Sequence, residues 1–338
     1  MKVIKQNVGI DVSKKELAVC LIFLREDLGI KIKGTRKFHN NESGFKAMME
    51  WLERKKDSAV PLHFTMEPTG VYHENLAYFL NDMEQLVHIV LGNKAKKYAE
   101  SLEVNSKTDK LDSKALSRMG LERTLELWNP GSPIYRQLKV LTRERSAILK
   151  LKVMIKNQLE AMLHSAFPNK KSTNRLNRLI KEFNSQVKKI EKDIDRLVEN
   201  DMELKSRILK VTTIPGVGFL TAVIIIAETD GFELIKSIKQ IVSYAGLDIK
   251  IRESGKWKGK SKISKAGNVH IRKALYWPAY SSITHTQTYK TFYERLFNRK
   301  EISMVASVAV QRKLLGLIYT LWKNGTVYID KYERKMVA

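Results

Sequence analysis

VGIDVSKKELAVCLIF, residues 8–23, holds two apolar segments separated by the short polar sequence SKK. A third segment of β-forming residues, IKIKGTRKF, occupies residues 30–38, after the polar sequence REDLG. Short segments rich in valine, isoleucine and leucine, joined by short turn-like connections, are typical of β-hairpins. The sequence therefore predicts an antiparallel meander of three strands between Val8 and Asn40.

Helices and strands alternate after this meander. The expected order is helix 44–56, strand 62–68, helix 73–83, strand 87–92 and a helical stretch from Lys94. Strands followed by an alternation of helix and strand are typical of a mixed α/β domain. We expect this domain to occupy residues 1–130.

Long helices without glycine follow between Pro133 and Lys210. Apolar residues recur there in two stripes at steps of three and four, although Arg145 and Lys152 interrupt the first stripe. The turn-rich sequence HSAFPNKKSTN separates the stripes. This pattern predicts a helical hairpin or coiled coil, which we assign to residues 131–205. Packing within the chain and packing against a second subunit both remain open, and the length of the segment favours a dimer-forming role.

The sequence VTTIPGVGFLTAVIIIAE, residues 211–228, places Gly216 and Gly218 between two helical patterns. In a helix-hairpin-helix, glycines at such a turn let backbone amides approach a DNA phosphate. The alternative is an ordinary tight turn between helices, because short glycine motifs often match by chance. Helical patterns at 291–322 complete this part, so we expect residues 206–338 to form a mostly helical domain.

The composition indicates a folded protein with a polyanionic partner. The chain has 338 residues, of which 43% are hydrophobic, so it can bury the cores of two or three domains. Its formal net charge of +25 exceeds what solubility requires and favours nucleic acid as the partner. A ribosome-associated factor with a basic, solvated surface is the alternative.

The sequence gives little support to a membrane or secreted protein. Its longest apolar runs, at 219–227 and 314–322, are shorter than the roughly 20 residues that span a bilayer. The sequence MKVIKQNVGID lacks the apolar core of a signal peptide. The single cysteine, Cys20, lies in an apolar strand-like segment and cannot form a disulfide within one chain. We therefore expect a cytoplasmic protein with no membrane partner.

Four acidic residues occur at positions that suit a divalent-metal site. Asp11 lies in the first predicted strand, Glu67 ends a later strand, and Asp109 and Asp112 lie in KTDKLDSKAL. Residues three apart share one face of a helix, so Asp109 and Asp112 can reach the same site. Carboxylate oxygens suit Mg²⁺ or Mn²⁺, and two such ions can bind the attacking and leaving oxygens of a phosphoryl transfer.

Each acid also has a purely structural explanation. Asp11 can cap a turn, Glu67 can be a surface charge, and Asp109 and Asp112 can stabilise the first turn of a helix. Their order along the chain favours the metal site. A ribonuclease-H-like site takes its carboxylates from a first strand, a central strand and a late helix.

Ser264 is the candidate nucleophile. It lies in a run, residues 250–273, that holds nine Lys or Arg residues and one acid. Cations attract a DNA backbone and stabilise the charge that develops when a hydroxyl attacks phosphorus. Of the nearby serines, only Ser264 is followed by K-x-G-N, a turn that can expose a hydroxyl at a helix entrance; its competitors are Ser254, Ser261, Ser281 and Ser282.

The basic side chains of this region are expected to contact nucleic acid, whereas His270 is expected to face DNA or to be structural rather than catalytic. Lys265 and Arg272 are also candidates for stabilising the charge on the reacting phosphate. With the two glycines above, the expected nucleic-acid-binding residues are Gly216, Gly218, Lys258, Lys260, Lys262, Lys265, Arg272 and Lys273.

Five segments, in this order along the chain, resemble the DEDD transposases of the insertion-sequence group one hundred and ten, relatives of the pilin-gene invertases: VGIDVSKKELAV, MEPTGVY, KTDKLDSKAL, IPGVG and SKISKAGNVHIRKALY. The resemblance covers nearly the whole chain. It implies a RuvC-like domain of the ribonuclease-H fold, a coiled-coil connection and a transposase domain. The family's metal-binding carboxylates correspond to Asp11, Glu67, Asp109 and Asp112, and its serine nucleophile corresponds to Ser264.

The resemblance also implies partners and a reaction. Family members cut and rejoin DNA through a phosphoserine intermediate, guided by a structured bridge RNA encoded beside the gene. They work as homo-oligomers, so a dimer or tetramer is expected here, with metal site and serine contributed by different subunits. Ala266 stands where the family often has a basic residue, which puts one local phosphate contact in doubt.

Two other functions compete with this expectation. In a metal-dependent nuclease or junction resolvase of the ribonuclease-H fold, the carboxylates would hydrolyse DNA and Ser264 would only bind phosphate. In a non-catalytic nucleic-acid-binding scaffold, the basic helices and the glycine turn would suffice. A covalent protein–DNA adduct separates the recombinase from the nuclease, and Mg²⁺-dependent cleavage separates both from the scaffold.

Overall fold

The computed structural model describes residues 2–68, 70–102, 108–233, 235–250, 253–254, 257–258 and 262–329. The chain divides into two compact units, residues 1–130 and 131–338. The helical hairpin expected at 131–205 belongs to the second unit. The expected division of the chain into three domains stays a prediction.

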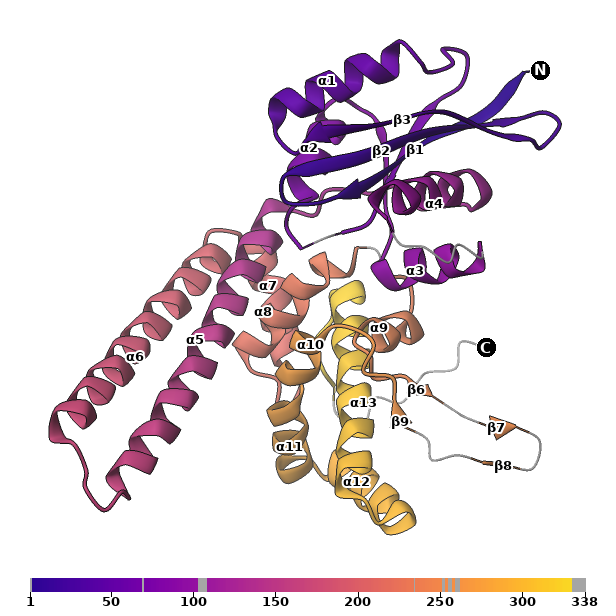
Figure 1. Ribbon diagram of the computed structural model, residues 1–338. Coiled ribbons are helices and arrows are strands. Elements are labelled where there is room, and N and C mark those ends of the chain that lie inside the picture. The colour runs from indigo at the N-terminus through magenta and orange to yellow at the C-terminus, as the bar shows by residue number, and fades with distance from the viewer. Residues whose placement is uncertain are drawn as a thin grey trace, which may run out of the picture. The chain divides into compact units, whose positions relative to one another are not determined.

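A five-stranded mixed sheet forms the centre of the first unit, with the strand order β3-β2-β1-β4-β5 (Figure 1). The three strands of the predicted meander pair antiparallel, whereas β1 pairs parallel with β4 and β4 pairs parallel with β5. The strands are β1 (Val3–Val12), β2 (Glu16–Arg25), β3 (Ile30–His39), β4 (Leu62–Met66) and β5 (Leu86–Ile89). This order and these directions are those of the ribonuclease-H fold, so the expected fold class is confirmed.

Helices cover both faces of this sheet (Figure 1). On one face, alternate residues of β1 and β2 pack against α1 (Glu42–Glu53) and α2 (Glu74–Asp82). On the other face lies α4 (Asp109–Glu122), and α3 (Gly92–Ser101) packs beside it. Cys20 is fully buried on this second face with Ile22 and Leu121, as its apolar surroundings predicted.

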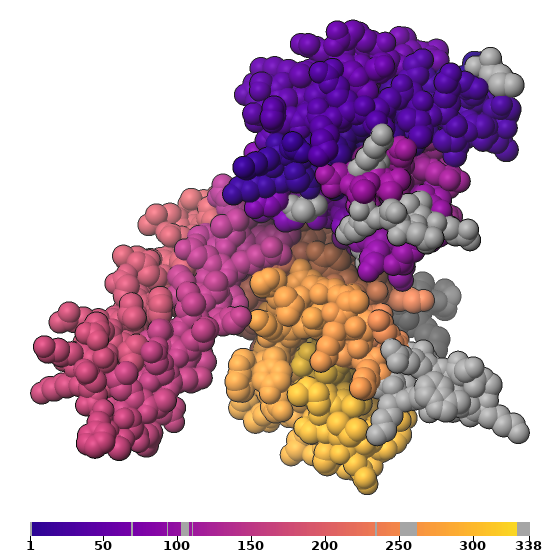
Figure 2. Space-filling view, in the orientation of Figure 1, coloured from indigo at the N-terminus to yellow at the C-terminus, as the bar shows by residue number. Residues whose placement is uncertain are grey.

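The second unit begins with two long helices, α5 (Pro133–Leu163) and α6 (Lys170–Glu199), that pack together as the predicted hairpin. The two residues that interrupt the apolar stripe of α5 find polar partners on α6. Arg145 donates to Glu191 at 2.7 Å, and Lys152 donates to the Asn184 side-chain oxygen at 3.1 Å. The free end of the hairpin projects away from the helices α10–α13 of the same unit (Figures 1 and 2).

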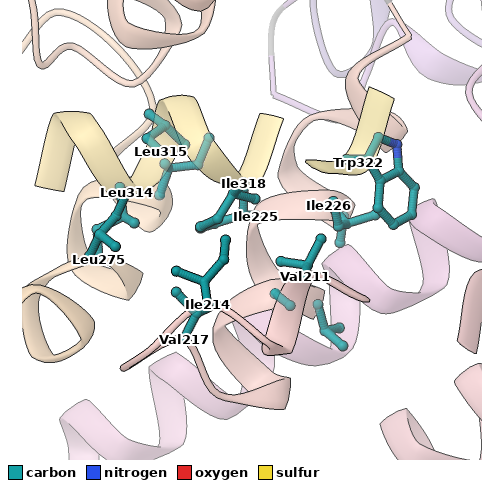
Figure 3. Close-up of a cluster of buried hydrophobic side chains, with 14 of the residues drawn as sticks. Val211, Ile214, Val217, Ile225, Ile226, Leu275, Leu314, Leu315, Ile318 and Trp322 are labelled. Carbon is teal, nitrogen blue, oxygen red and sulfur yellow. The ribbon is translucent and has the colours of Figure 1, made fainter. Parts of the chain in front are cut away.

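The remaining helices enclose a single large apolar core, part of which is drawn in Figure 3. They are α7 (Met202–Thr212), α8 (Phe219–Glu228), η1 (Asp230–Phe232), α9 (Ile238–Tyr244), α10 (Val269–Ala274), α11 (Tyr276–His285), α12 (Gln287–Lys300) and α13 (Ser303–Asn324). Short strands β6 (Ile249–Lys250) and β9 (Lys262–Ile263) form one ribbon, and β7 (Glu253–Ser254) pairs with β8 (Trp257–Lys258). The mostly helical character expected of this part is confirmed.

Helix α13 is long and apolar enough to cross a membrane by length and composition alone. Half of its most apolar window is nevertheless buried, and Leu314, Ile318 and Trp322 lie in the core of the second unit. The core helix of a folded unit passes the same test of length and composition. Packing against α9 and α12 explains its apolar sequence without a bilayer.

Candidate active site

Asp11 and Glu67 lie at the same edge of the sheet in the first unit. Strands β1 and β4 run parallel with Ile10 opposite Met66, so the next residue of each strand reaches that edge together. Glu67 is partly buried against the start of α3, where a Cβ atom at Gly92 would lie 2.4 Å from its Oε1. A side chain at position 92 would therefore displace this carboxylate.

Helix α4 brings Asp109 and Asp112 toward the same edge. A Cβ atom at Gly9 would lie 2.0 Å from the Ser113 carbonyl oxygen, and one at Gly120 would lie 2.1 Å from Nδ2 of Asn7. Helix α4 thus runs antiparallel to β1 across the face that carries Asn7, Gly9 and Asp11. Its first turn, which holds both aspartates, points to the end of β1 where Asp11 lies.

Glu67 projects from the same face as these residues. Thr65 lies two positions earlier, and its hydroxyl oxygen accepts a hydrogen bond of 3.0 Å from Asn7 on the α4 face. Side chains two apart in a strand share one face. All four acids therefore lie toward one face and one edge of the sheet, and their role as a metal site stays a prediction.

The four carboxylates share one region of the sheet, but their oxygens are not close enough together to form a metal site in this structure. Within the described residues, no three His, Cys, Asp or Glu side chains are grouped so that they could hold a metal ion. Lys37 on β3 instead reaches both Glu16, at 2.9 Å, and Asp109, at 3.4 Å. Hydrogen bonds to these two acids raise the pKa of Lys37. The donor set is all oxygen and suits Mg²⁺ or Mn²⁺, so its chemistry fits such an ion, and Lys37 competes for Asp109.

Ser264 lies in the second unit, directly after β9. The β6–β9 ribbon pairs Ile249 with Ile263, so Asp248 and Ser264 are the next facing residues. The Ser264 amide donates to the Asp248 carbonyl at 2.8 Å, and the Ser264 hydroxyl donates to Oδ1 of Asp248. Ser264 is therefore attached to Asp248 through both its backbone and its side chain.

A tight turn connects Ser264 to helix α10. Lys265 has a φ of 51°, in the left-handed region, and its amide donates to the Gly246 carbonyl at 3.0 Å. Gly267 must be a glycine here, since a Cβ atom would lie 2.4 Å from the Tyr244 carbonyl oxygen. Asn268 ends the turn as the N-cap of α10, accepting hydrogen bonds from the amides of His270 and Ile271 at 2.9 and 3.2 Å. This confirms a turn followed by a helix entrance after Ser264.

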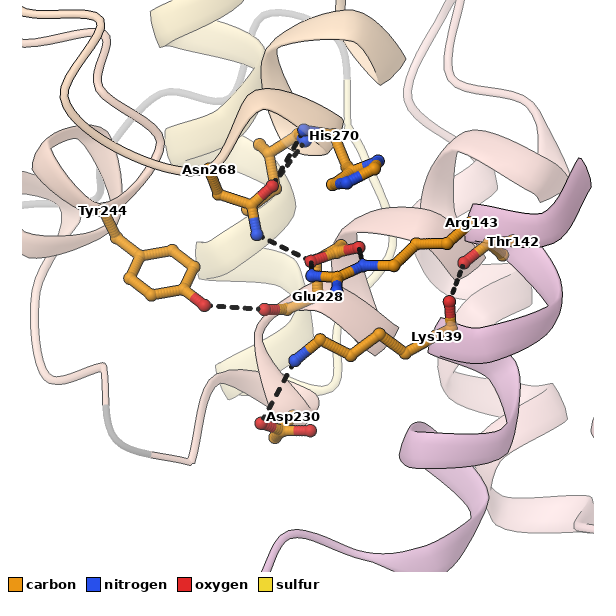
Figure 4. A network of polar contacts seen from close by, with 9 residues as sticks. Lys139, Thr142, Arg143, Glu228, Asp230, Tyr244, Asn268 and His270 are labelled. Atoms are coloured by element: carbon orange, nitrogen blue, oxygen red, sulfur yellow. Dashed lines mark hydrogen bonds and ion pairs between the residues drawn. The ribbon is translucent and has the colours of Figure 1, made fainter. Parts of the chain in front are cut away.

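A buried acid, Glu228, contacts the end of this turn through Asn268 (Figure 4). Its side chain is fully buried at the end of α8 and accepts two hydrogen bonds from Arg143 of α5, at 2.7 and 2.9 Å. Asn268 adds a third, at 2.6 Å, and Tyr244 donates to the Glu228 backbone carbonyl at 3.0 Å. Burial opposes ionisation, but the hydrogen bonds from Arg143 and Asn268 outweigh it and lower the pKa of Glu228.

Three residues of this arrangement were missed from the sequence. Glu228 directly follows the apolar run 219–227. An acid at the end of a buried helix needs a polar partner, so this position could have been predicted from the sequence as a buried, paired carboxylate. The sequence has no local signal for the contacts of Arg143 and Asp248, because their partners lie 85 and 16 residues away along the chain.

The expected nucleic-acid-binding residues have different surroundings. Lys262, Lys265 and Lys273 are exposed, whereas Arg272 uses Nη1 to hold the carbonyls of Ala245 and Gly267 at 2.7 and 3.1 Å. Lys260 and the side chain of Lys258 lie outside the described residues. Burial lowers the pKa of His270, only partly offset by Glu228, and this favours the structural role for that ring.

The glycine turn between α7 and α8 has a structural reason of its own. Gly216 has a φ of 88°, and a Cβ atom there would lie 2.5 Å from the Ser282 hydroxyl oxygen and 2.7 Å from the Pro278 carbonyl oxygen. Gly218 faces open space. The packing of Gly216 against α11 explains the first glycine as a tight turn, and the DNA contact expected at both glycines stays a prediction.

Of the alternative serines that the structure describes, Ser282 is the least suited to attack a phosphate. Ser282 is fully buried, and its hydroxyl donates to the carbonyls of Pro215 and Pro278 at 2.6 and 2.8 Å. Ser261 and the side chain of Ser254 lie outside the described residues. Ser281 and Ser264 are both partly buried, but only Ser264 lies in the turn before α10.

Two family models match the chain, one before helix α6 and one after it. The model of the IS110 DEDD transposases matches residues 8–168, and that of the IS116/IS110/IS902 transposases matches residues 209–294. The chain belongs to the IS110 family of transposases. As a member, it is an enzyme of phosphoryl transfer that acts on DNA, which confirms the family and the class of reaction expected from the sequence motifs.

This IS110 transposase is similar over nearly its whole length to two curated relatives. It is 28% identical to the pilin gene-inverting protein of Moraxella bovis, over 95% of this chain and 97% of that protein. It is 27% identical to the pilin gene-inverting protein of Moraxella lacunata, over the same shares. Among solved structures, Thermus thermophilus RuvC matches 36% of the transposase and 99% of its own chain, with 9% identity and a TM-score of 0.29.

Proposed function

We propose that this transposase cuts and rejoins DNA through Ser264, which forms a covalent phosphoserine intermediate. The observation that carries the proposal is the hydroxyl of Ser264, which donates to Asp248 and lies in a turn beside the exposed Lys265. A serine hydroxyl is a weak nucleophile and needs an activating partner, and the Asp248 carboxylate is within hydrogen-bond reach of it. The covalent link keeps the energy of the phosphodiester bond, so strands can be exchanged and resealed without ATP.

Asp11, Glu67, Asp109 and Asp112 would hold Mg²⁺ or Mn²⁺ in this proposal. The ion, when bound, would neutralise charge on the reacting phosphate and its leaving oxygen. The support is the gathering of all four acids on one face and one edge of the sheet. The exposed Lys262, Lys265 and Lys273 would hold the DNA backbone through charge.

The decisive experiment traps the protein on DNA. The full-length transposase is incubated with Mg²⁺, labelled DNA from the region flanking its gene, and RNA transcribed from that region, and is then denatured. A labelled DNA end attached to the protein is expected, and the Ser264→Ala variant should give none. Clean cleaved ends with no adduct would identify a nuclease instead, and an adduct formed by Ser264→Ala would remove the serine from the mechanism.

A structured bridge RNA, encoded beside the gene, supplies the choice of site in this proposal. The support is the family membership together with a net charge of +25, which suits two nucleic-acid partners. Omitting the transcribed RNA from the trapping experiment should abolish site-specific adducts while leaving non-specific DNA binding. Equal adduct yield without RNA would show that the protein itself selects the site.

The transposase is also proposed to work as a homo-oligomer, a dimer or tetramer. Helix α5 supports this because Val140, Leu151 and Met154 expose apolar side chains, by 61%, 47% and 59%. Light scattering should report more than one subunit for the purified protein and a smaller mass for the double variant Leu151→Lys, Met154→Lys. The exposed Asn157→Lys on the same helix is the control, and an unchanged mass in the double variant would remove α5 from the interface.

A further inference from the structure

We infer that Asp248 is the proton acceptor that activates Ser264. The inference rests on the proposed function, because it assigns a role to Asp248 only if Ser264 attacks phosphorus. The Ser264 hydroxyl proton already points at Oδ1 of Asp248. A general base must lie within hydrogen-bond reach of the proton that it removes, and Asp248 meets this condition before any substrate is bound.

The two residues are held in this relationship by the backbone. They are facing neighbours at the end of the β6–β9 ribbon, and the Ser264 amide donates to the Asp248 carbonyl at 2.8 Å. The Lys265 amide donates to the Gly246 carbonyl at 3.0 Å and so holds the two segments together next to the pair. The pair is therefore pre-organised rather than formed by flexible side chains on an open surface.

The remaining bonding capacity of the serine oxygen suits a nucleophile. A hydroxyl has one proton and two lone pairs. The proton is given to Asp248, and one lone pair receives the Ala266 amide, with the nitrogen 3.3 Å from the serine oxygen. One lone pair is left for attack on phosphorus.

The reaction balances with Asp248 in this role. As the bond from the Ser264 oxygen to phosphorus forms, the serine proton passes to Asp248, and the bond from phosphorus to the leaving deoxyribose oxygen breaks. The leaving oxygen takes a proton from solvent and becomes a free hydroxyl. During rejoining a strand hydroxyl attacks phosphorus and loses its proton to solvent, the phosphorus–serine bond breaks, and Asp248 returns its proton to Ser264.

A structural hydrogen bond is the competing explanation, and the Asp248→Asn variant separates the two. An asparagine side chain keeps an oxygen that accepts the Ser264 hydroxyl, but it cannot take up the proton. Removing a general base typically costs about 10²- to 10⁴-fold in rate. We expect Asp248→Asn to form the DNA adduct more slowly by this factor, with unchanged melting temperature and DNA affinity, while the exposed Asp195→Asn keeps the wild-type rate.

A rescue experiment covers the case in which Asp248→Asn alters the turn. In Asp248→Ala a small carboxylate can enter the vacated space, so added formate should recover part of the roughly 10²- to 10⁴-fold loss and raise the rate of adduct formation at least about tenfold. Chloride at the same ionic strength is the control. A rate for Asp248→Asn within a factor of about three of wild type, or equal rates in formate and chloride, would overturn the assignment of Asp248.

The same assays distinguish this failure from failure of the proposed function. Adduct formation by Ser264→Ala would remove both assignments. Loss of the adduct in Ser264→Ala, combined with a wild-type rate in Asp248→Asn, would keep the nucleophile and remove only its base.

Discussion

Arg143 and Glu228 form a two-bond ion pair between the base of the helical hairpin and the end of α8, with nitrogen–oxygen distances of 2.7 and 2.9 Å. Glu228 is fully buried, whereas the Arg143 side chain is about half exposed. The buried carboxylate also receives the Asn268 amide. The pair therefore joins α5, α8 and the turn that carries Ser264.

Replacing Arg143 with methionine should destabilise the second unit, because the change leaves a buried carboxylate without its counter-charge. Loss of one partner of a buried pair costs about 3–5 kcal/mol, and the half-exposed arginine places this case nearer 2–3 kcal/mol. Urea denaturation measures the loss. The double variant Arg143→Met, Glu228→Leu should recover part of it, and recovery stays incomplete because the Asn268 amide then lacks its acceptor. A single variant as stable as wild type would contradict the importance of the pair.

The same acid predicts a loss of stability in acid. The pKa of Glu228 is lowered in the folded protein, so the unfolded chain binds its proton more readily. The contribution of Glu228 to stability is therefore complete above its ordinary pKa of 4.5 and is lost as pH falls below that value. Unfolding free energies measured between pH 7 and pH 3 should fall more steeply in wild type than in Glu228→Gln. Equal slopes would remove Glu228 from the acid transition.

His63 and His88 should titrate below pH 6.5. His88 Nδ1 lies 2.9 Å from the Glu126 carbonyl, so it is the donor there, and its Nε2 must accept from Nδ1 of His63, also 2.9 Å away. Burial is the main reason that the pKa of each ring is lowered from 6.5. Folding stability should therefore fall as pH drops below 6.5, where the unfolded chain takes up protons first. NMR titration of labelled histidines, assigned with His63→Asn and His88→Asn, checks this, and a pKa above 6.5 for either ring would contradict it.

Replacement by alanine should destabilise the protein at Gly216 but not at Gly218. At Gly216 the φ of 88° and the contact with Ser282 oppose a side chain, so Gly216→Ala should cost about 1–3 kcal/mol. Gly218 has a φ of −83° and open space, so Gly218→Ala should leave the melting temperature unchanged. Reduced DNA affinity in Gly218→Ala at unchanged stability would support the helix-hairpin-helix contact. Equal stability of both variants would contradict the packing explanation for Gly216.

DNA binding should weaken steeply with salt. Each duplex phosphate neutralised by a basic side chain contributes about −0.9 to the slope of log affinity against log salt. Lys262→Gln and Lys273→Gln should each reduce the steepness by about one contact, measured by fluorescence anisotropy at several salt concentrations. Lys188→Gln, an exposed change on α6, is the matched control. Slopes that stay at the wild-type value would place these two lysines away from DNA.

Glu67→Gln and Asp112→Asn should abolish Mg²⁺-dependent strand cleavage while leaving DNA affinity near wild type. Each variant removes a charged oxygen donor from the gathered acids and leaves the basic surface of the second unit unchanged. Cleavage and anisotropy are measured on the same DNA, with EDTA as the metal-free control. Normal cleavage in both variants would separate the four acids from the chemistry.

The sequence predicted most of the architecture because local patterns determine it. The β-forming segments in 8–23 predicted the first strands of the meander. Apolar residues spaced three and four apart predicted the two helices of the hairpin. Arg145 and Lys152 were seen only as interruptions, since their partners Glu191 and Asn184 lie on the facing helix. The candidate acids were chosen because they lie near a strand end or in the first turn of a helix, and their role as a metal site stays a prediction.

The immediate surroundings of Ser264 could not be predicted in the same way. Asp248 faces Ser264 only because a ribbon folds back between them, and the sequence from 250 to 273 reads simply as basic. Arg143 reaches Glu228 across a helix packing whose geometry has no local signal. Such contacts depend on tertiary packing, which periodicity and residue type do not specify.

The ion pair at the foot of the hairpin also restricts how the second unit can move. A rotation of α5 away from α8 would withdraw Arg143 and leave an acid enclosed in apolar surroundings, at a cost of several kcal/mol. Asn268, which donates to the same carboxylate at the entrance of α10, would then contact an acid without its counter-charge. A displacement of α5 at its Arg143 end should therefore also disturb the turn that carries Ser264. We expect the base of the hairpin and this turn to move together.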